Sequence, residues 1–174
     1  MLPRTNTIPS WPFVGREDVE GGAMTLRCKA KAEAVIRLLN EALAMEIICV
    51  LRYKRHYFMT AGIRSRHVKA KLLQHVTEEQ AHADQLAERI VQLGSEPDLS
   101  PERLLNRNHS EHVEEDSLVE MITADLLAER NAIDSYRDLI AYVGADDPTT
   151  RQILERIVAQ EEEHAEALAS LLRA

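Results

Sequence analysis

Four apolar series at helical spacing, separated by breaks, constrain the fold of this 174-residue chain more than any other feature. Residues three and four positions apart lie on one helix face, so each series predicts a helix with a single buried stripe. The stripes run through positions 35–53, 68–86, 118–136 and 150–168. Breaks follow at Thr60–Gly62, Gly94 and Gly144, and Asp147 with Pro148 forms a cap and first turn for the last helix.

The connections between these helices differ in length. The first and third are short, whereas residues 94–116 are rich in Gly, Ser, Pro, Asn and Asp. A connection of that length can carry the chain from one end of a helix bundle to the other. The sequence therefore predicts an all-α fold, an antiparallel four-helix bundle with one long crossover between helices two and three. The helix directions are then up, down, down, up.

A single domain accounts for a chain of this length, which can bury a substantial core. Residues 1–24 include three prolines and end in Gly21-Gly22, so we expect an irregular N-terminal arm there. Trp11 could dock this arm onto a neighbouring chain. The bundle is expected over residues 25–174.

Charge and hydropathy argue against several classes of partner. The formal net charge is -8, whereas nucleic acid binding needs clustered Lys and Arg. No stretch approaches the roughly 18 uncharged apolar residues of a membrane span. The first 24 residues also lack a basic segment followed by an apolar run. We therefore expect no membrane association and a cytoplasmic location.

Each stripe is interrupted near its middle by titratable residues. The interruptions are Glu46, Glu79 with His82, Glu129, and Glu161 with His164. They occur at similar heights, so a bundle would bring them together in its core. Burying even one unpaired carboxylate costs several kcal/mol, so four need counter-charges. Two divalent cations would balance the four negative charges, and neutral histidines would complete the ligand set.

The spacing predicts a role for each ligand. In Glu-x-x-His the two side chains lie on one helix face, which directs an oxygen and a nitrogen donor toward the same point. Glu79 and Glu161 are placed to bridge two metal ions. The terminal ligands would be His82, His164, Glu46 and Glu129. This oxygen-rich set favours iron or manganese over structural zinc.

Three stretches carry a resemblance to a known family: LLNEALAMEIICVLRYKRHYF, EEQAHADQLAERI and EEEHAEAL. They resemble the ferritin-like di-iron carboxylate superfamily, and within it bacterioferritin, over about residues 35–172. The resemblance implies a ferroxidase centre of two iron ions per subunit, made by the six residues above with Tyr53 as a nearby tyrosine. It also implies oxidation of Fe(II) by dioxygen or hydrogen peroxide and storage of ferric mineral inside a homo-oligomeric cage.

Two departures from bacterioferritin change the expected cofactor and assembly. That family has a haem-ligating methionine directly after the second-helix glutamate, where this chain has Gln80, so we expect no haem. It also has a short fifth helix lining a channel of its 24-subunit shell, whereas this chain ends ten residues after His164. We therefore expect a twelve-subunit shell like that of Dps mini-ferritins. The inter-subunit iron pattern of ordinary Dps proteins is absent, so direct binding to DNA is not expected.

Two other functions stay open at this point. One is a di-iron or di-manganese redox enzyme, such as a peroxidase or an oxygenase, that stores no iron and saturates at two metals per chain. The absence of any Cys-x-x-Cys pair argues against a rubredoxin-type electron module in such an enzyme. The other is a bundle that uses the site only as a structural metal clip or partner-binding scaffold.

Four residues near the predicted centre each have two interpretations. Tyr53 could donate a hydrogen bond or an electron to the centre, or be a core aromatic. Cys49 could be a thiol near the metals or a small buried hydrophobe. His75 and Glu78 could help to move iron, or be a hydrogen-bonded core histidine and a solvated glutamate.

Overall fold

Four long helices make up most of the computed structural model, which describes residues 29–61, 66–102, 104 and 117–173. They are α1 (Lys29–Met59), α2 (Arg66–Gln92), α4 (Leu118–Val143) and α5 (Pro148–Arg173). The described residues contain no strand, which confirms the predicted all-α class. None of these helices is both long and apolar enough to cross a membrane. The N-terminal arm with Trp11, and the predicted helix start near residue 25, lie outside the described residues.

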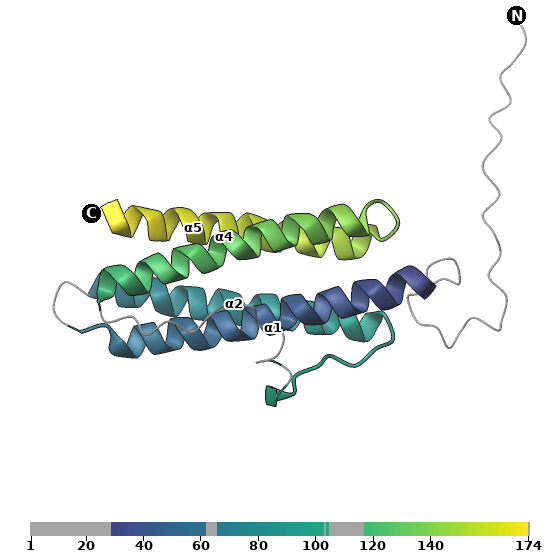
Figure 1. Ribbon diagram of the computed structural model, residues 1–174, viewed down its shortest axis with the longest axis horizontal. Helices are drawn as coiled ribbons and strands as arrows, with labels where there is room; N and C mark the ends of the chain where they lie inside the picture. The colour runs from purple at the N-terminus through teal and green to yellow at the C-terminus, as the bar shows by residue number, and fades with distance from the viewer. Residues whose placement is uncertain (1–28, 62–65, 103, 105–116, 174) are drawn as a thin grey trace, which may run out of the picture.

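Two helical hairpins lie side by side to form the bundle (Figure 1). Helix α1 packs along α2 and α4 along α5, while α1 also contacts α4 and α2 contacts α5. In Figure 1, α1 and α5 run from right to left and α2 and α4 run from left to right. This is the predicted order of directions. Because α2 ends and α4 begins at opposite ends of the bundle, the long crossover between them is also confirmed.

The helix ends follow the residues that the sequence indicates. Gly94 and Gly144, just beyond α2 and α4, have φ angles of 79° and 62°, a conformation that glycine adopts without a steric penalty. Helix α5 begins at Pro148, and Asp147 caps it by accepting a hydrogen bond from the Thr150 amide at 3.0 Å. These signals define where each helix stops or starts, and therefore how the four align.

The beginning of the crossover is anchored on α1. The backbone N–H of Asp98 donates a hydrogen bond to Asn40 Oδ1 at 2.7 Å, and the Asn40 amide donates to the Ile36 carbonyl at 3.0 Å. Asn40 is buried. This amide therefore satisfies backbone groups of both segments and fixes the crossover against the first hairpin.

The apolar core is divided into two clusters. One contains Leu39, Leu86, Leu154 and Ile157, and the other contains Val50, Leu72, Ile122 and Leu168. In every helix, the titratable interruptions of the stripe lie between the residues of these two clusters. The residues of the four predicted apolar series are buried, except Leu118 and, beyond the ranges given above, Tyr57, Ile140 and Leu171, which are half-buried. The fold thus places a polar layer in the middle of an otherwise apolar bundle.

Candidate metal centre

Six titratable side chains from four helices meet in this middle layer. Glu46 comes from α1, Glu79 and His82 from α2, Glu129 from α4, and Glu161 and His164 from α5. None is more than 4% exposed. The structure therefore brings together all six predicted ligands, and Tyr53 is buried beside them.

The six residues divide into two overlapping sets of potential metal ligands. One set is Glu46, Glu79, His82 and Glu161, and the other is Glu79, Glu129, Glu161 and His164. Within each set, one donor atom from every residue lies within 4.8 Å of the others. Glu79 and Glu161 belong to both sets, which is the geometry expected of carboxylates that bridge two ions.

Both histidines direct Nδ1 toward the carboxylates. His82 Nδ1 lies 2.9 Å from Glu161 Oε1, and His164 Nδ1 lies 3.0 Å from Glu79 Oε1. Their other ring nitrogens point outward, where His82 Nε2 lies 3.1 Å from Gln160 Oε1 and His164 Nε2 lies 2.8 Å from Glu78 Oε2. Metal-binding histidines usually have this arrangement, with one nitrogen on the metal and the other hydrogen-bonded to an outer group.

The hydrogen bonding within the cluster also fits a metal centre. Among the described residues, seven buried side-chain nitrogen and oxygen atoms lack a hydrogen bond of normal geometry, and all belong to this layer. They are Glu46 Oε2, Glu79 Oε1, both Glu161 oxygens, and Nδ1 of His75, His82 and His164. Buried polar groups without partners are rare in proteins. Divalent cations would provide partners for the carboxylate oxygens and the two ligand imidazoles.

Two of the glutamates favour the protonated form. Burial raises the pKa of Glu46, and the neighbouring charges of Glu161 and Glu79 raise it further. Burial raises the pKa of Glu129 as well, again reinforced by Glu161 and Glu79. These carboxyls therefore remain protonated at a higher pH than an exposed glutamate when no cation is bound.

The bridging glutamates and the histidines favour their charged forms instead. The pKa values of these glutamates are lowered, and those of the histidines are raised. Burial alone would raise the pKa of Glu79 and Glu161, but the close approach of the His164 and His82 imidazoles lowers both. Burial alone would lower the pKa of His164, but Glu161 and Glu79 raise it to about 10. The pKa of His82 is raised in the same way by Glu161, Glu46 and Glu79, against the effect of burial. In the metal-free centre, attraction between the imidazoles and the carboxylates therefore favours protonated histidines and ionised bridging glutamates.

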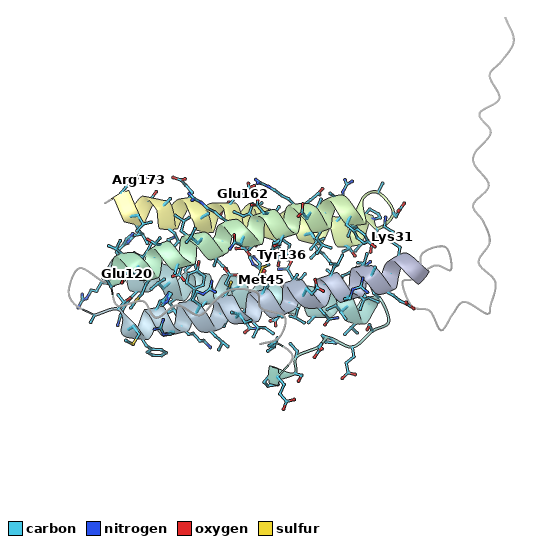
Figure 2. All side chains as sticks on the ribbon, in the orientation of Figure 1. Lys31, Met45, Glu120, Tyr136, Glu162 and Arg173 are labelled. Carbon is cyan, nitrogen blue, oxygen red and sulfur yellow. The ribbon has the colours of Figure 1, made fainter. Side chains whose placement is uncertain are left out.

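Two tyrosines complete the layer. Tyr53 on α1 donates a hydrogen bond to Glu129 on α4, and Tyr136 on α4 donates one to Glu46 on α1. Both tyrosines are 1% exposed, and Figure 2 shows Tyr136 at mid-length of the bundle, where α4 faces α1. The sequence indicated Tyr53 but treated Tyr136 only as a core residue. The repeated spacing of seven residues from Glu46 to Tyr53 and from Glu129 to Tyr136 could have revealed it.

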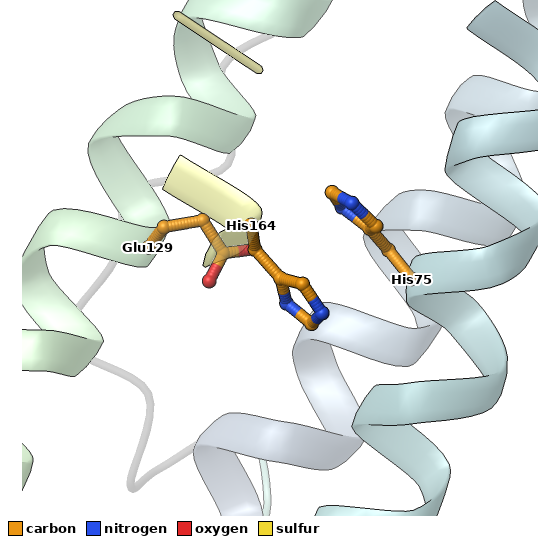
Figure 3. A group of neighbouring side chains, drawn as sticks. All are labelled: His75, Glu129 and His164. Atoms are coloured by element: carbon orange, nitrogen blue, oxygen red, sulfur yellow. The ribbon is translucent and has the colours of Figure 1, made fainter. Parts of the chain in front are cut away.

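His75 lies against the second donor set. Its ring stacks on His164 with centroids 4.1 Å apart and an interplanar angle of 18°, and it meets the edge of Tyr53 at 5.1 Å. Figure 3 shows the His164 ring between the Glu129 carboxylate and His75. Burial and the nearby His164 lower the pKa of His75 to about 4, so its ring is neutral at pH 7. One donor atom each of His75, Glu129 and His164 lies within 4.8 Å of the others, so His75 is a further potential ligand beside the second set.

A buried histidine and aspartate pair lies one turn from the centre and was not predicted from the sequence. His56 Nδ1 on α1 lies 2.9 Å from both carboxylate oxygens of Asp125 on α4. Both side chains are fully buried. The pair adds to the two tyrosine hydrogen bonds that already join α1 to α4.

Gln80 and Cys49 lie at the margins of the centre. Gln80 is exposed and donates a hydrogen bond to Asp84 at 3.0 Å, and the expected absence of haem stays a prediction. Cys49 is 6% exposed, packs in the same apolar cluster as Val50, and has a pKa raised by burial. The packing favours the interpretation of Cys49 as a small buried hydrophobe.

Comparison with known proteins identifies the family. The model of the ferritin-like domain matches residues 36–174, which includes every residue of the centre. The chain belongs to the ferritin-like family. Bacterioferritin from Streptomyces coelicolor is 31% identical to it over 143 residues, which cover 79% of each chain.

Solved structures agree with this ferritin-like assignment. A dodecameric thioferritin, the bacterioferritin-related protein from Bacteroides fragilis, superposes with a TM-score of 0.77 at 27% identity, covering 82% of this chain and 86% of that one. A ferritin-like, diiron-carboxylate protein from Bacillus anthracis gives a TM-score of 0.72 at 26% identity, covering 86% and 99%. The ferritin-like bundle predicted from the sequence is thereby confirmed.

Proposed function

We propose that this protein oxidises ferrous iron at a di-iron centre inside each subunit and stores the ferric product in an oligomeric cage. The pair of overlapping donor sets, which share Glu79 and Glu161 within one bundle, carries the proposal. Membership of the ferritin-like family and similarity to bacterioferritin support it.

Two ferrous ions are the substrate in this proposal. Glu79 and Glu161 would bridge them, and each ion would also have one terminal glutamate and one histidine from its own set. The bridges hold the ions close enough to react with one oxidant molecule. Dioxygen would take one electron from each ion and two protons, giving hydrogen peroxide and two ferric ions. Hydrogen peroxide as oxidant would take two electrons and two protons, giving two waters.

Loading the centre would exchange protons for cations. The pKa values of His82, His164, Glu46 and Glu129 are all raised, which favours the protonated form of each group in the metal-free protein. Two divalent cations bring four positive charges, equal to the charge of the four protons that they would displace. The buried layer would therefore bind iron with no large change in its net charge.

We propose a twelve-subunit cage in preference to a 24-subunit one. The Bacteroides fragilis protein, which resembles this chain over most of its length, is named as dodecameric. The donor set would also accept manganese, whose ligand preferences are close to those of iron.

Aerobic addition of ferrous iron to metal-free protein tests the function. Ferric absorbance would be followed with time, and the iron retained per chain counted after gel filtration. The test variant is Glu79→Ala with Glu161→Ala, and the matched control is Glu88→Ala with Glu163→Ala, which removes two exposed glutamates from the same helices. Circular dichroism would check that both variants keep their helix content.

Each outcome assigns the protein to a different class. Fast oxidation with tens of irons retained per chain, lost in the test variant and kept in the control, is the result expected for an iron-storing ferroxidase. Saturation at two irons per chain would move the protein to the di-iron redox enzymes. Oxidation no faster than in the test variant would contradict a ferroxidase and leave a structural or non-iron site.

A further inference from the structure

The two histidines of the centre differ in the group that holds their outer nitrogen. His164 Nε2 lies 2.8 Å from a carboxylate oxygen of Glu78, whereas His82 Nε2 lies 3.1 Å from the amide oxygen of Gln160. One imidazole therefore contacts a negatively charged group and the other a neutral group. Each donor set otherwise offers the same types of ligand, three glutamates and one histidine.

This difference determines which nitrogen carries the proton in the His164 ring but not in the His82 ring. An ionised carboxylate can only accept hydrogen bonds, so His164 Nε2 must carry the proton, and in the neutral ring the lone pair lies on Nδ1. An amide can present either its oxygen or its NH₂ group to a ring nitrogen, so Gln160 is compatible with both tautomers of His82. When a metal ion displaces the Nδ1 proton, the contact with Glu78 thus keeps the remaining proton of His164 on Nε2, whereas Gln160 would also accept the other tautomer of His82.

A carboxylate also makes the imidazole a stronger donor. It polarises the N–H bond and increases electron density at the opposite nitrogen, as outer-shell carboxylates do for many metal-binding histidines. Glu78 is itself held in position, because Gln74 donates to its other oxygen at 2.9 Å and Lys71 donates to Gln74 at 3.0 Å.

The stacking of His75 acts on the same ring. Its ring lies beside the His164 ring (Figure 3) and stacks on one face of it with centroids 4.1 Å apart, which restricts rotation of that imidazole. His164 is therefore oriented both at its outer edge and on one face. A ligand held in its binding orientation loses less conformational freedom when the metal arrives.

We propose that Glu78 makes the position formed by Glu79, Glu129, Glu161 and His164 the tighter of the two metal positions, so that it fills first with a divalent cation. Glu78 is a positioning residue here, since it acts on the metal through His164. The inference rests on the proposed di-metal centre but not on its oxidation chemistry. The two steps of metal binding should therefore have clearly different dissociation constants.

Cobalt(II) titration of the metal-free full-length protein tests this order without any oxidation of iron. Visible absorption would measure the two binding steps, and anomalous diffraction at the cobalt edge would locate the ion in crystals prepared with one equivalent per chain. We expect two resolved steps in the wild type, with the first ion beside His164. Glu78→Gln should weaken the tight step by roughly 10-fold, the lower end of typical outer-shell effects.

Two further variants distinguish the effect of the contact between Glu78 and His164 from the effect of any negative charge near the centre. Gln160→Glu places a carboxylate on His82 and should tighten the weaker step, bringing the two affinities together. Glu163→Gln removes one exposed negative charge next to His164 in sequence and should leave the ratio of the two steps unchanged. If Glu78→Gln and Glu163→Gln weakened the tight step equally, Glu78 would act only through its charge and not through its contact with His164. That result would overturn the proposal.

Other results would also contradict it. The first cobalt ion beside His82, a cobalt ion bound directly by Glu78, or two equal steps in the wild type would each overturn the proposed order. If two equal steps accompanied normal iron oxidation, the proposed function would stand and only this inference would fail. If no cobalt bound between the six ligands, the di-metal centre itself would be wrong.

Discussion

The two tyrosines and two glutamates of helices α1 and α4 form a reciprocal pair of hydrogen bonds. Tyr53 donates to Glu129, and Tyr136 donates to Glu46. Each tyrosine follows the glutamate of its own helix by seven residues, or nearly two turns. Because α1 and α4 run in opposite directions, the same spacing on both helices lets each tyrosine reach the glutamate of the other. The two terminal carboxylates are therefore oriented by equivalent contacts.

Removing one of these phenols should destabilise the metal-free protein. Tyr136→Phe takes away the hydrogen-bond donor to a buried carboxyl, which costs about 1–3 kcal/mol when the acceptor stays buried without it. The midpoint of urea unfolding, measured at one fixed protein concentration, should fall accordingly. Tyr142→Phe, which alters a tyrosine that is 45% exposed on the same helix, is the control and should leave the midpoint nearly unchanged. Equal midpoints for both variants would show that the Tyr136 contact contributes no stability.

The protons in the centre predict how the stability of the metal-free protein depends on pH. The pKa of His164 is about 10 in the folded chain, against 6.5 for an ordinary histidine. Between these values the folded state binds more protons than the unfolded state, so stability falls as pH rises. The raised pKa values of Glu46 and Glu129 act in the same direction. The melting temperature in the presence of a chelator should therefore decrease from pH 6.5 to 10, and an increase over this range would contradict the assignment.

At the scale of helices, Arg89 connects the two hairpins at the end of the bundle opposite the start of α2. It is 6% exposed on α2, and its guanidinium donates to Thr150 Oγ1 at 2.7 Å and to Asp147 at 3.0 Å. Asp147 is the residue that caps α5. One side chain therefore joins α2 to the N-terminus of α5 and helps to align Glu79 with Glu161.

Arg89→Met should weaken the association of the hairpins. The variant keeps most of the apolar stem but removes hydrogen bonds to a carboxylate and a hydroxyl, so we expect a loss of about 2–3 kcal/mol in unfolding free energy. Arg151→Met is the control, since Arg151 is exposed and its ion pair with Glu155 on the same helix is of the kind that contributes less than about 1 kcal/mol. Chemical unfolding followed by circular dichroism would compare the two. A larger loss in the control would contradict the role given to Arg89.

The helices and the six ligands were predictable because each depends on the pattern of one helix. Helical spacing reveals the buried stripe, and a titratable residue in that stripe must be buried whatever the neighbouring helices are. Gly94, Gly144 and Asp147 likewise act within a few residues of their own positions. Such local signals require no knowledge of how the helices are rotated against one another.

The contacts of Glu78 and Gln160 with the outer nitrogens of the two histidines could not be predicted from single-helix patterns. Glu78 and Gln160 lie beside the stripe rather than in it, and their bonds to His164 and His82 span 86 and 78 residues of sequence. Whether such a side chain meets a ring or solvent depends on the relative rotation of α2 and α5. The pairing of His56 with Asp125, 69 residues apart, depends in the same way on α1 and α4.

At the scale of the whole molecule, the exposed apolar side chains of α1 favour assembly. Leu51, Phe58 and Met59 are 60%, 77% and 58% exposed in the single chain. Leu51 and Phe58 are seven residues apart and so lie on one face of the helix. Contact between copies of the chain would remove this apolar surface from water and stabilise an oligomer.

The proposed assembly predicts a definite particle mass. A twelve-subunit cage should have twelve times the 19.7 kDa mass of one chain, measured by sedimentation equilibrium without added iron. The mass should not change when the terminal ligand Glu46 is replaced by Ala, because the centre lies inside one bundle and not between subunits. A mass of 24 chains would favour the bacterioferritin type of shell, and a monomer or dimer would contradict a cage.

Anomalous diffraction at the iron edge, from crystals soaked with ferrous iron under anaerobic conditions, tests the di-iron centre most directly. We predict two iron peaks in each subunit, one in each donor set, with carboxylate oxygens of Glu79 and Glu161 bound to both ions. A single peak per subunit, or iron found only outside the layer formed by the six ligands, would contradict a di-iron centre in this protein.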